Sequence, residues 1–144
     1  MSSSPTTTRQ TRRTGLALRV LGALALGYSA YLHFRIAAER PPLYADGQFT
    51  LSGLFVAQAV AATFVSLWVL VRGTRLAWLA FGAVALGSLA ALVLSVYVQI
   101  PAMGPFPLIY EPVWYLDKNL AAASAAVAAV LALVALATAR RPSR

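Results

Sequence analysis

The sequence predicts an all-α fold, a four-helix transmembrane bundle, from three observations. Of the 144 residues, 60% are hydrophobic and only 11% are charged, whereas soluble domains carry about a quarter charged residues. The mean hydropathy is +0.72. Three stretches without any charge reach the roughly 20 apolar residues that a helix needs to cross a bilayer. Because so few charges cannot coat a globule in water, we expect lipid to surround most of the surface.

The spans follow from the positions of these stretches. Three of them cover residues 51–71, 76–100 and 119–139. A fourth span is expected over residues 16–38, if Arg19 and Arg35 extend toward opposite interfaces. The predicted membrane domain is therefore 16–139. It lies between a polar tail (1–15), expected to be disordered and cytoplasmic, and a basic cytoplasmic tail (140–144).

The basic residues predict the orientation of the bundle. Nine of the twelve Lys and Arg residues lie before or at the start of the first span, in the short link RGTR, or after the fourth span. All four acids lie in the other two links. The positive-inside rule then places both termini in the cytoplasm, in the cytoplasmic membrane of a bacterium. The net charge of +8 is explained as a topology signal, so nucleic-acid binding is not expected.

A cleaved signal peptide is the alternative for the N-terminal span. TRRTG resembles a basic n-region, and ALGYSA ends in a small-x-small pattern that would allow cleavage after Ala30. Against cleavage, Arg19 interrupts the apolar region, and hydrophobic residues continue beyond Ala30 through Tyr31 and Phe34. We therefore expect the first span to be retained.

Composition and motifs also limit the possible chemistry. The chain has no cysteine, which excludes disulfides, thiol catalysis, iron–sulfur clusters and Cys-ligated zinc. One histidine cannot build a His-rich metal site or a bis-histidine haem within one chain. No P-loop, HExxH or GxSxG motif occurs, and no acid lies in the middle of a span. We therefore predict no catalysis, cofactor or metal of its own, with an enzyme as the less favoured alternative.

Two proline-containing links, ERPPLYADGQF and IPAMGPFPLIYEPVWYLDKNL, lie on the predicted outer face. Proline restricts the backbone and blocks helix propagation, and the apolar side chains of the second link are unsuited to a loop in water. We expect an ordered, Pro- and aromatic-rich outer cap. Glu111 and Asp117 are predicted to pair with Arg35, Arg40 or Lys118 and so to form a salt-bridged lid.

His33 is the single histidine and lies near the outer end of the first span. By helical spacing, Tyr28, Tyr31 and Arg35 share one face, while His33 points elsewhere. Arg35 and Glu39 are four residues apart, the spacing of an ion pair on a helix. A histidine hydrogen-bonded to loop backbone and a proton-relay or ligand-contact role are the two main interpretations of His33. A metal or haem ligand is a third, which would need further ligands from Glu111, Asp117 or another subunit.

Gln58 is an amide about two turns inside the second span, where an unpaired polar group would be costly. We expect it to form a hydrogen bond across the bundle, with Ser29, Ser95, Tyr97 or a backbone carbonyl as the partner. A structural role and a place in a polar pocket beneath the outer links both stay open. The candidate outer-face pocket consists of His33, Tyr31, Arg35, Glu39, Gln58, Tyr110, Glu111 and Trp114.

Small residues four apart predict where helices approach closely. The fourth span contains the nearly all-alanine stretch AAASAAVAAV, which suits close contact. Packing within the chain is expected, with a homo-oligomer or partner interface as the alternative. Trp68 and Trp78 are expected to anchor helices at the cytoplasmic interface. The spaced small pairs are Ala23/Gly27, Ala57/Ala61, Ala83/Gly87 and Gly87/Ala91.

The opening RVLGALALGYSAYLHF, the four-span layout and the small-residue fourth helix resemble the small DoxX-like membrane proteins. They are also similar to small four-helix membrane proteins of high-GC actinobacteria. The likeness covers residues 16–139 in layout and the first span in residue pattern. It implies a four-helix membrane bundle and, in some members, a part in membrane redox or thiosulfate/quinone chemistry. No active-site motif of the family matches positions of this chain, so no catalytic residue is implied.

The predicted function is that of a small integral membrane protein without its own catalysis, an accessory or partner-binding subunit that uses its outer links. One alternative is a binder or carrier of a small lipophilic, quinone-like molecule. That pocket would be lined by His33, Tyr31, Gln58, Tyr110 and Trp114. A DoxX-like membrane redox subunit is the other alternative. Expected partners are the lipid bilayer and a membrane protein or a second copy of the chain.

Overall fold

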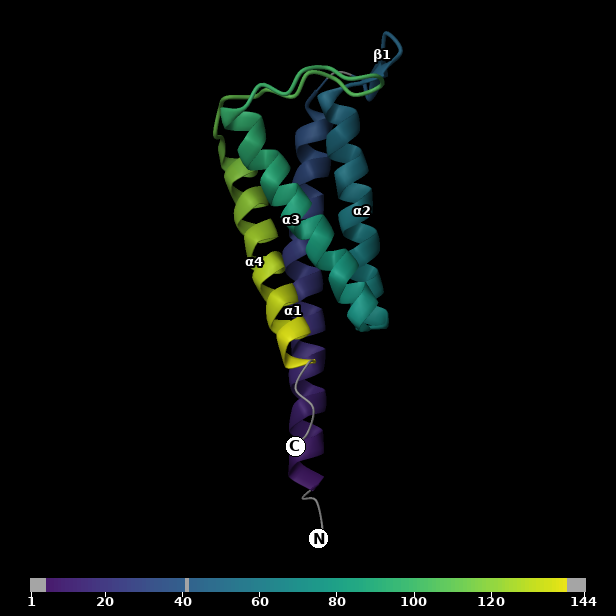
Figure 1. Cartoon of the computed structure of the whole chain (residues 1–144), viewed down its shortest axis with the longest axis vertical. Coiled ribbons are helices and arrows are strands. Elements are labelled where there is room, and N and C mark those ends of the chain that lie inside the picture. Colours follow the sequence, from purple (N-terminus) through teal and green to yellow (C-terminus); the bar gives the residue numbers. More distant parts are fainter. Residues whose placement is uncertain (1–4, 41, 140–144) are drawn as a thin grey trace.

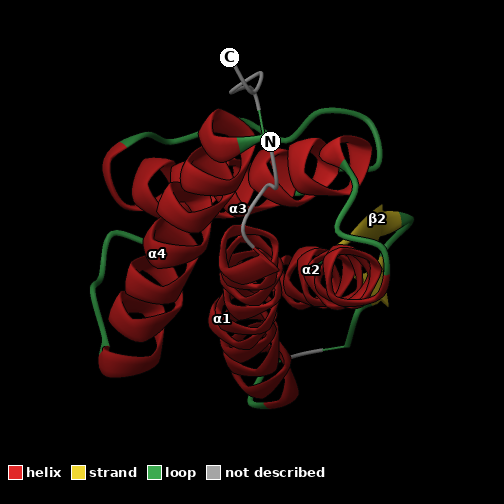
Figure 2. Cartoon of the chain, turned by 90° about the horizontal axis from the view of Figure 1, so that it is seen from below, coloured by secondary structure: helices red, strands yellow, loops and turns green. Residues whose placement is uncertain are grey.

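Four long helices form the bundle. In the computed structural model, which describes residues 5–40 and 42–139, these helices are α1 (Pro5–Ala38), α2 (Leu51–Val71), α3 (Arg75–Tyr97) and α4 (Leu116–Thr138). They pack in the cyclic order α1–α2–α3–α4 (Figure 1, Figure 2). Each helix contains a segment long and apolar enough to cross a membrane. The predicted all-α four-helix fold is confirmed, and it defines a multi-pass α-helical membrane protein.

Helix ends differ from the predicted spans at three places. α1 already begins at Pro5, so the described part of the tail predicted to be disordered is helical. Proline suits the first helical position, and a helix nucleated by its membrane span extends at little cost. α3 ends at Tyr97 and not at residue 100, because Val98 is extended. α4 begins at Leu116, three residues early, which places Asp117 in its first turn, where the helix dipole favours an acid.

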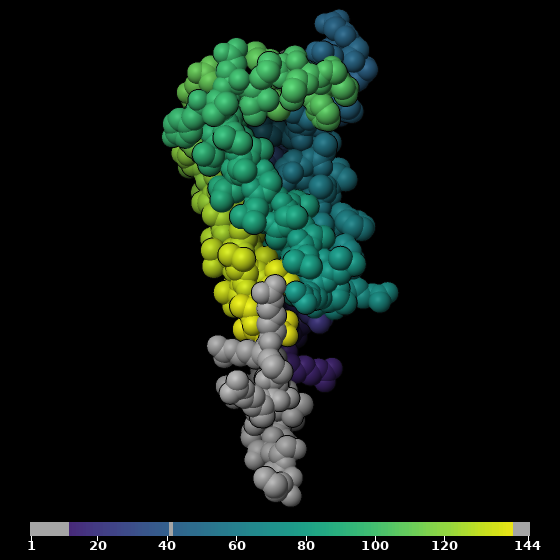
Figure 3. All heavy atoms as spheres, in the orientation of Figure 1, coloured from purple at the N-terminus to yellow at the C-terminus, as the bar shows by residue number. Residues whose placement is uncertain are grey.

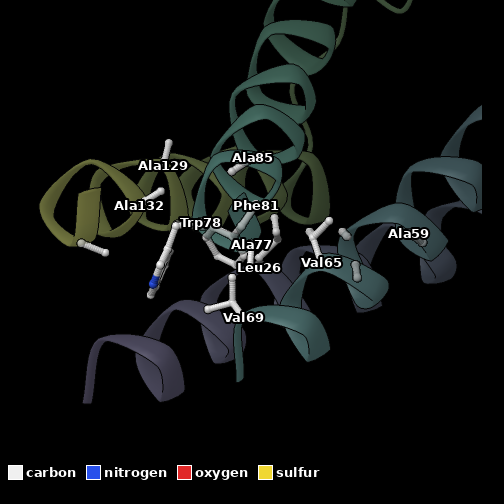
Figure 4. Packing of buried hydrophobic residues seen from close by; sticks show 14 residues of the cluster. Leu26, Ala59, Val65, Val69, Ala77, Trp78, Phe81, Ala85, Ala129 and Ala132 are labelled. Carbon is white, nitrogen blue, oxygen red and sulfur yellow. The ribbon is translucent and has the colours of Figure 1, made fainter. Parts of the chain in front are cut away.

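The core of the bundle is built from small residues around a few large ones (Figure 4). Phe81 is completely buried and meets the Trp78 ring edge-on, with centroids 5.3 Å apart. A Cβ at Gly22 would lie 3.1 Å from the Trp78 ring, so the missing side chain lets α3 pack against α1. α4 lies close to its neighbours mainly through alanine. Its buried alanines are Ala121, Ala122, Ala125, Ala128, Ala129, Ala132 and Ala135.

Two predictions about helix faces are wrong. Trp78 is only 6% exposed, so it is a core residue and not an interfacial anchor. Ala57, Ala83, Gly87 and Ala91 are exposed, so four members of the spaced small pairs do not pack inside the chain. Spacing identifies residues on a common face, but in a helix that is apolar all round it does not say which face is buried.

The two longer linkers form one ordered layer, the cap, defined here as residues 39–40, 42–50 and 98–115. The cap covers the end of the bundle opposite the N-terminal end of α1 (Figure 3). It contains a short antiparallel hairpin of β1 (Tyr44–Ala45) and β2 (Gln48–Phe49). In the other linker, Ile100 and Ile109 exchange backbone hydrogen bonds of 3.1 and 3.0 Å. Phe49 N donates to Pro105 O at 2.8 Å and joins the two linkers. The predicted ordered cap is therefore confirmed.

Thr50 and Gly53 fix the cap to the first turn of α2. The Thr50 hydroxyl accepts a hydrogen bond from Gly53 N at 3.2 Å and donates one to Pro42 O at 2.7 Å. Thr50 N donates to Leu43 O at 3.1 Å. A Cβ on Gly53 would overlap the Leu43 carbonyl oxygen. Only glycine therefore lets this part of the cap rest on α2.

We predict that Gly53→Ala destabilises the protein by about 1–3 kcal/mol, because the new methyl group displaces backbone that cannot easily move. Gly87→Ala is the matched control, since nothing lies within 4 Å of a Cβ at this exposed α3 position. There alanine is expected to leave stability unchanged or to raise it by about 1 kcal/mol. Thermal unfolding in detergent measures both variants. Equal melting temperatures for the two variants would contradict the close contact.

Candidate functional site

A cavity of about 230 Å³ lies beneath the cap, bounded by α1, α2, α3 and the linker before α4. Its volume exceeds the roughly 150 Å³ of an engineered protein cavity that holds benzene. The space therefore suffices for one substituted ring. Six of the lining residues are apolar: Leu51, Leu54, Phe55, Ala91, Leu92 and Ile109. Five are polar: His33, Gln58, Ser88, Ser95 and Glu111.

His33 reaches this cavity from α1. It is 3% exposed, and its ring lies 5.6 Å from the Phe55 ring, centroid to centroid. Nδ1 donates to the Ser29 carbonyl oxygen, one turn earlier in α1, at 2.7 Å. The partner is therefore the helix's own backbone and not the loop backbone predicted from the sequence. In the neutral ring, Nε2 is left as an acceptor, and it has no hydrogen-bond partner within residues 5–40 and 42–139.

Gln58 of α2 and Ser88 of α3 both line the cavity. Gln58 Nε2 donates to the Val84 carbonyl oxygen at 3.4 Å, so the predicted cross-bundle bond to a backbone carbonyl is confirmed. Val84 precedes Ser88 by four residues, and its carbonyl is one that a serine in a helix commonly binds. The Ser88 hydroxyl is 1% exposed and lacks a partner in the described part of the chain. Such a buried group calls for an explanation.

Glu111 closes the cavity from the cap side and connects two linkers. Its backbone N–H donates to Ser95 O at 2.7 Å. Its carboxylate pairs with Arg40 from the other linker. Lys118, completely buried at the start of α4, donates to the Glu111 carboxylate at 3.2 Å and to its carbonyl oxygen at 3.0 Å. The predicted salt-bridged lid is confirmed, with Glu111 as its shared acid.

Tyr115 and nearby aromatic rings complete this network. Arg40 also donates to the Tyr115 hydroxyl at 3.0 Å, while its guanidinium lies 5.2 Å from the centre of the Phe55 ring. Burial by itself lowers the pKa of Arg40, but the hydrogen bond and charge of Glu111 outweigh burial and raise that pKa. Burial, followed by the Glu111 charge, raises the pKa of Tyr115. The tyrosine therefore remains a neutral hydrogen-bonding group.

Of the eight residues of the predicted pocket, three line the cavity: His33, Gln58 and Glu111. The other five do not. Tyr31 is exposed and stacks on Tyr28, with ring centroids 6.3 Å apart, which confirms that this face is separate from His33. Tyr110 and Glu39 are also exposed. Trp114 lies beside the cavity and donates to the Tyr97 hydroxyl at 3.2 Å.

Arg35 pairs with Asp117, with 3.3 Å between Nη2 and Oδ2. This is one of the pairs predicted for the acids of the cap and is confirmed, whereas the Arg35–Glu39 pair suggested by helical spacing is not among the ion pairs of the described chain. A partner on the same helix is favoured by local spacing, but α4 starts three residues earlier than predicted, and this brings Asp117 to the end of α1. The tertiary contact replaces the local one.

Sequence analysis missed Phe55, Ser88 and, as a cavity residue, Ser95. Ser88 and Ser95 are seven residues apart on α3, which places both on one face of the helix. That spacing of two hydroxyls in an otherwise apolar span was the available signal. Phe55 carries no such signal, because aromatic residues occur on every face of these spans.

The described residues contain no group of three or more His, Asp or Glu side chains that could hold a metal ion. Comparison with known proteins adds no relative, since no family model matches this chain and no curated protein or solved structure is significantly similar to it. The class of the protein therefore rests on its helices, and its candidate site rests on the cavity.

We predict that Glu111→Gln lowers the free energy of unfolding by about 3 kcal/mol, because it leaves the buried Lys118 and the half-buried Arg40 without a counter-charge. Asp117→Asn is the comparison. It breaks an ion pair whose Arg35 side chain is 47% exposed, so its effect should be much smaller. Thermal unfolding in detergent at low and high salt measures both. A larger loss for Asp117→Asn would contradict the central role of Glu111.

Proposed function

We propose that this integral membrane protein binds a small lipophilic molecule of single-ring size in the cavity beneath the cap. The observation that carries the proposal is the convergence of His33, Gln58 and Glu111, from α1, α2 and the cap, on one largely apolar space. Pockets for small molecules combine such apolar walls with a few polar groups that orient the ligand.

The position of the cavity supports a lipophilic ligand. Ala91 both lines the cavity and is exposed on α3, so the space extends to the outer surface of the bundle between helices. A molecule dissolved in the bilayer could enter there without crossing the cap. The network of Glu111, Arg40 and Lys118 lies above the cavity and separates it from the water side.

We predict that an apolar photoreactive probe, phenyl(trifluoromethyl)diazirine, labels the cavity walls when the protein is embedded in liposomes. Labelled peptides, identified by mass spectrometry, should be concentrated at the outer ends of α2 and α3, around Phe55 and Leu92. The extent of labelling on the other lipid-facing surfaces should be proportional to their exposure to lipid. The cavity label should saturate with probe concentration, because it comes from one site.

Ala91→Phe, which adds a ring at the cavity wall, should reduce the cavity label severalfold. Ala90→Phe is the matched control, since Ala90 is exposed on the same helix and does not line the cavity. Uniform, non-saturating labels, or equal effects of the two variants, would show that the protein has no such binding site.

The partner-binding role predicted from the sequence is the second candidate, supported by exposed apolar side chains on the cap. Met103 and Phe106 are 58% and 50% exposed. We expect photocrosslinkers at these two positions to capture a membrane protein or a second copy of the chain in native membranes, whereas one at exposed Leu133 of α4 should not. A monomer with no captured product would argue against this role. The redox role implied by the DoxX resemblance stays a prediction.

A further inference from the structure

We infer that the ligand of this cavity donates a hydrogen bond, and so belongs to the neutral hydroxylated lipophiles such as phenols and alcohols. The inference rests on the proposed function and adds the chemistry of the polar group that is recognised. It follows from what each of the five polar side chains in the cavity wall can still offer to a guest. Those side chains are His33, Gln58, Ser88, Ser95 and Glu111.

Three of the five can only accept. His33 Nδ1 donates its proton to the Ser29 carbonyl oxygen, so a neutral imidazole presents the Nε2 lone pair. The Ser95 hydroxyl donates its proton to the Leu92 carbonyl oxygen at 2.8 Å, so toward a guest it can only accept. The Glu111 carboxylate has no proton to give and retains lone pairs beyond its bonds to Arg40 and Lys118.

The other two can donate or accept. Gln58 uses one amide proton on the Val84 carbonyl oxygen, which leaves a second proton and its own carbonyl oxygen. The Ser88 hydroxyl has no partner among the described residues, but its oxygen is enclosed by its neighbours. A guest that donates can thus pair with the three accept-only groups or with the Gln58 carbonyl oxygen, whereas a guest that only accepts has just the Gln58 amide.

The charges around the cavity favour a neutral donor. Glu111 already faces two cations, Arg40 and Lys118, so an ammonium group would add a third positive charge beside one carboxylate. A carboxylate guest would meet Glu111 without a cation in the wall. A hydroxyl satisfies the acceptors without the cost of burying a further charge.

The test compares three molecules of similar size as competitors of the diazirine label in liposomes. Para-cresol donates through its hydroxyl, para-methylanisole has a methoxy group in its place, and acetophenone offers only a carbonyl acceptor. Concentrations are expressed per volume of bilayer, so that differences in partitioning cancel. We expect para-cresol to protect the cavity at about tenfold lower concentration than the other two, because each of those leaves polar groups of the wall unpaired.

Two variants separate recognition from general disturbance of the fold. Ser95→Ala removes an accept-only group and should reduce the preference for para-cresol. Ser124→Ala is the matched control, because Ser124 also donates to a carbonyl three residues earlier, Ala121 O at 3.1 Å, but does not line the cavity. Thermal unfolding confirms that each variant is folded.

The outcomes distinguish the two proposals. Equal protection by the three molecules, or better protection by acetophenone, would overturn the hydroxyl preference and leave the proposed binding function intact. If none protects and the label does not saturate, the binding function fails, and the hydroxyl preference fails with it. An unchanged preference in Ser95→Ala would show that Ser95 is not one of the recognising groups.

Discussion

The Glu111 carboxylate is the group on which the cap end of the bundle depends. Lys118 is fully buried, so its ammonium group has no access to water and must find its partners inside the protein. Glu111 supplies two of them and pairs with Arg40 as well. One acid thus joins both linkers and the start of α4. An uncompensated charge here would cost several kcal/mol, and this cost holds the cap in a single arrangement.

The cavity is a consequence of the same arrangement. The backbone of Glu111 is tied to the Ser95 carbonyl oxygen, so the cap crosses the bundle at a fixed height above α3. The side chains beneath it, such as Leu92 and Phe55, do not fill the remaining space. His33 and Gln58 each donate a hydrogen bond to a backbone carbonyl oxygen through one nitrogen. Each keeps a second hydrogen-bonding atom for the cavity. The cavity is therefore framed by the hydrogen bonds and ion pairs that hold the cap.

Much of the fold could be predicted because lipid offers no hydrogen bonds to the backbone, which must therefore form them within the protein. Uncharged apolar stretches of sufficient length favour spanning helices, and an acid enclosed with cations is expected to pair, as Glu111 does with Arg40 and Lys118. Predictions from local spacing failed where a residue on another helix provided the contact. Arg35 pairs with Asp117 rather than with Glu39 on its own helix, and Trp78 lies in the core because Gly22 provides the space for its ring.

The sequence by itself determined four apolar helices, an ordered cap and the residues able to form its ion pairs, because these depend on composition and on short-range geometry. It also determined that Gln58 needs an internal partner. Only the tertiary structure decided which helix faces are buried, and hence that His33, Ser88 and Glu111 border one space while Tyr31 does not. In a helix that is apolar all round, the buried face is chosen by the fit of side chains on neighbouring helices. That fit is a property of pairs of helices rather than of any single segment.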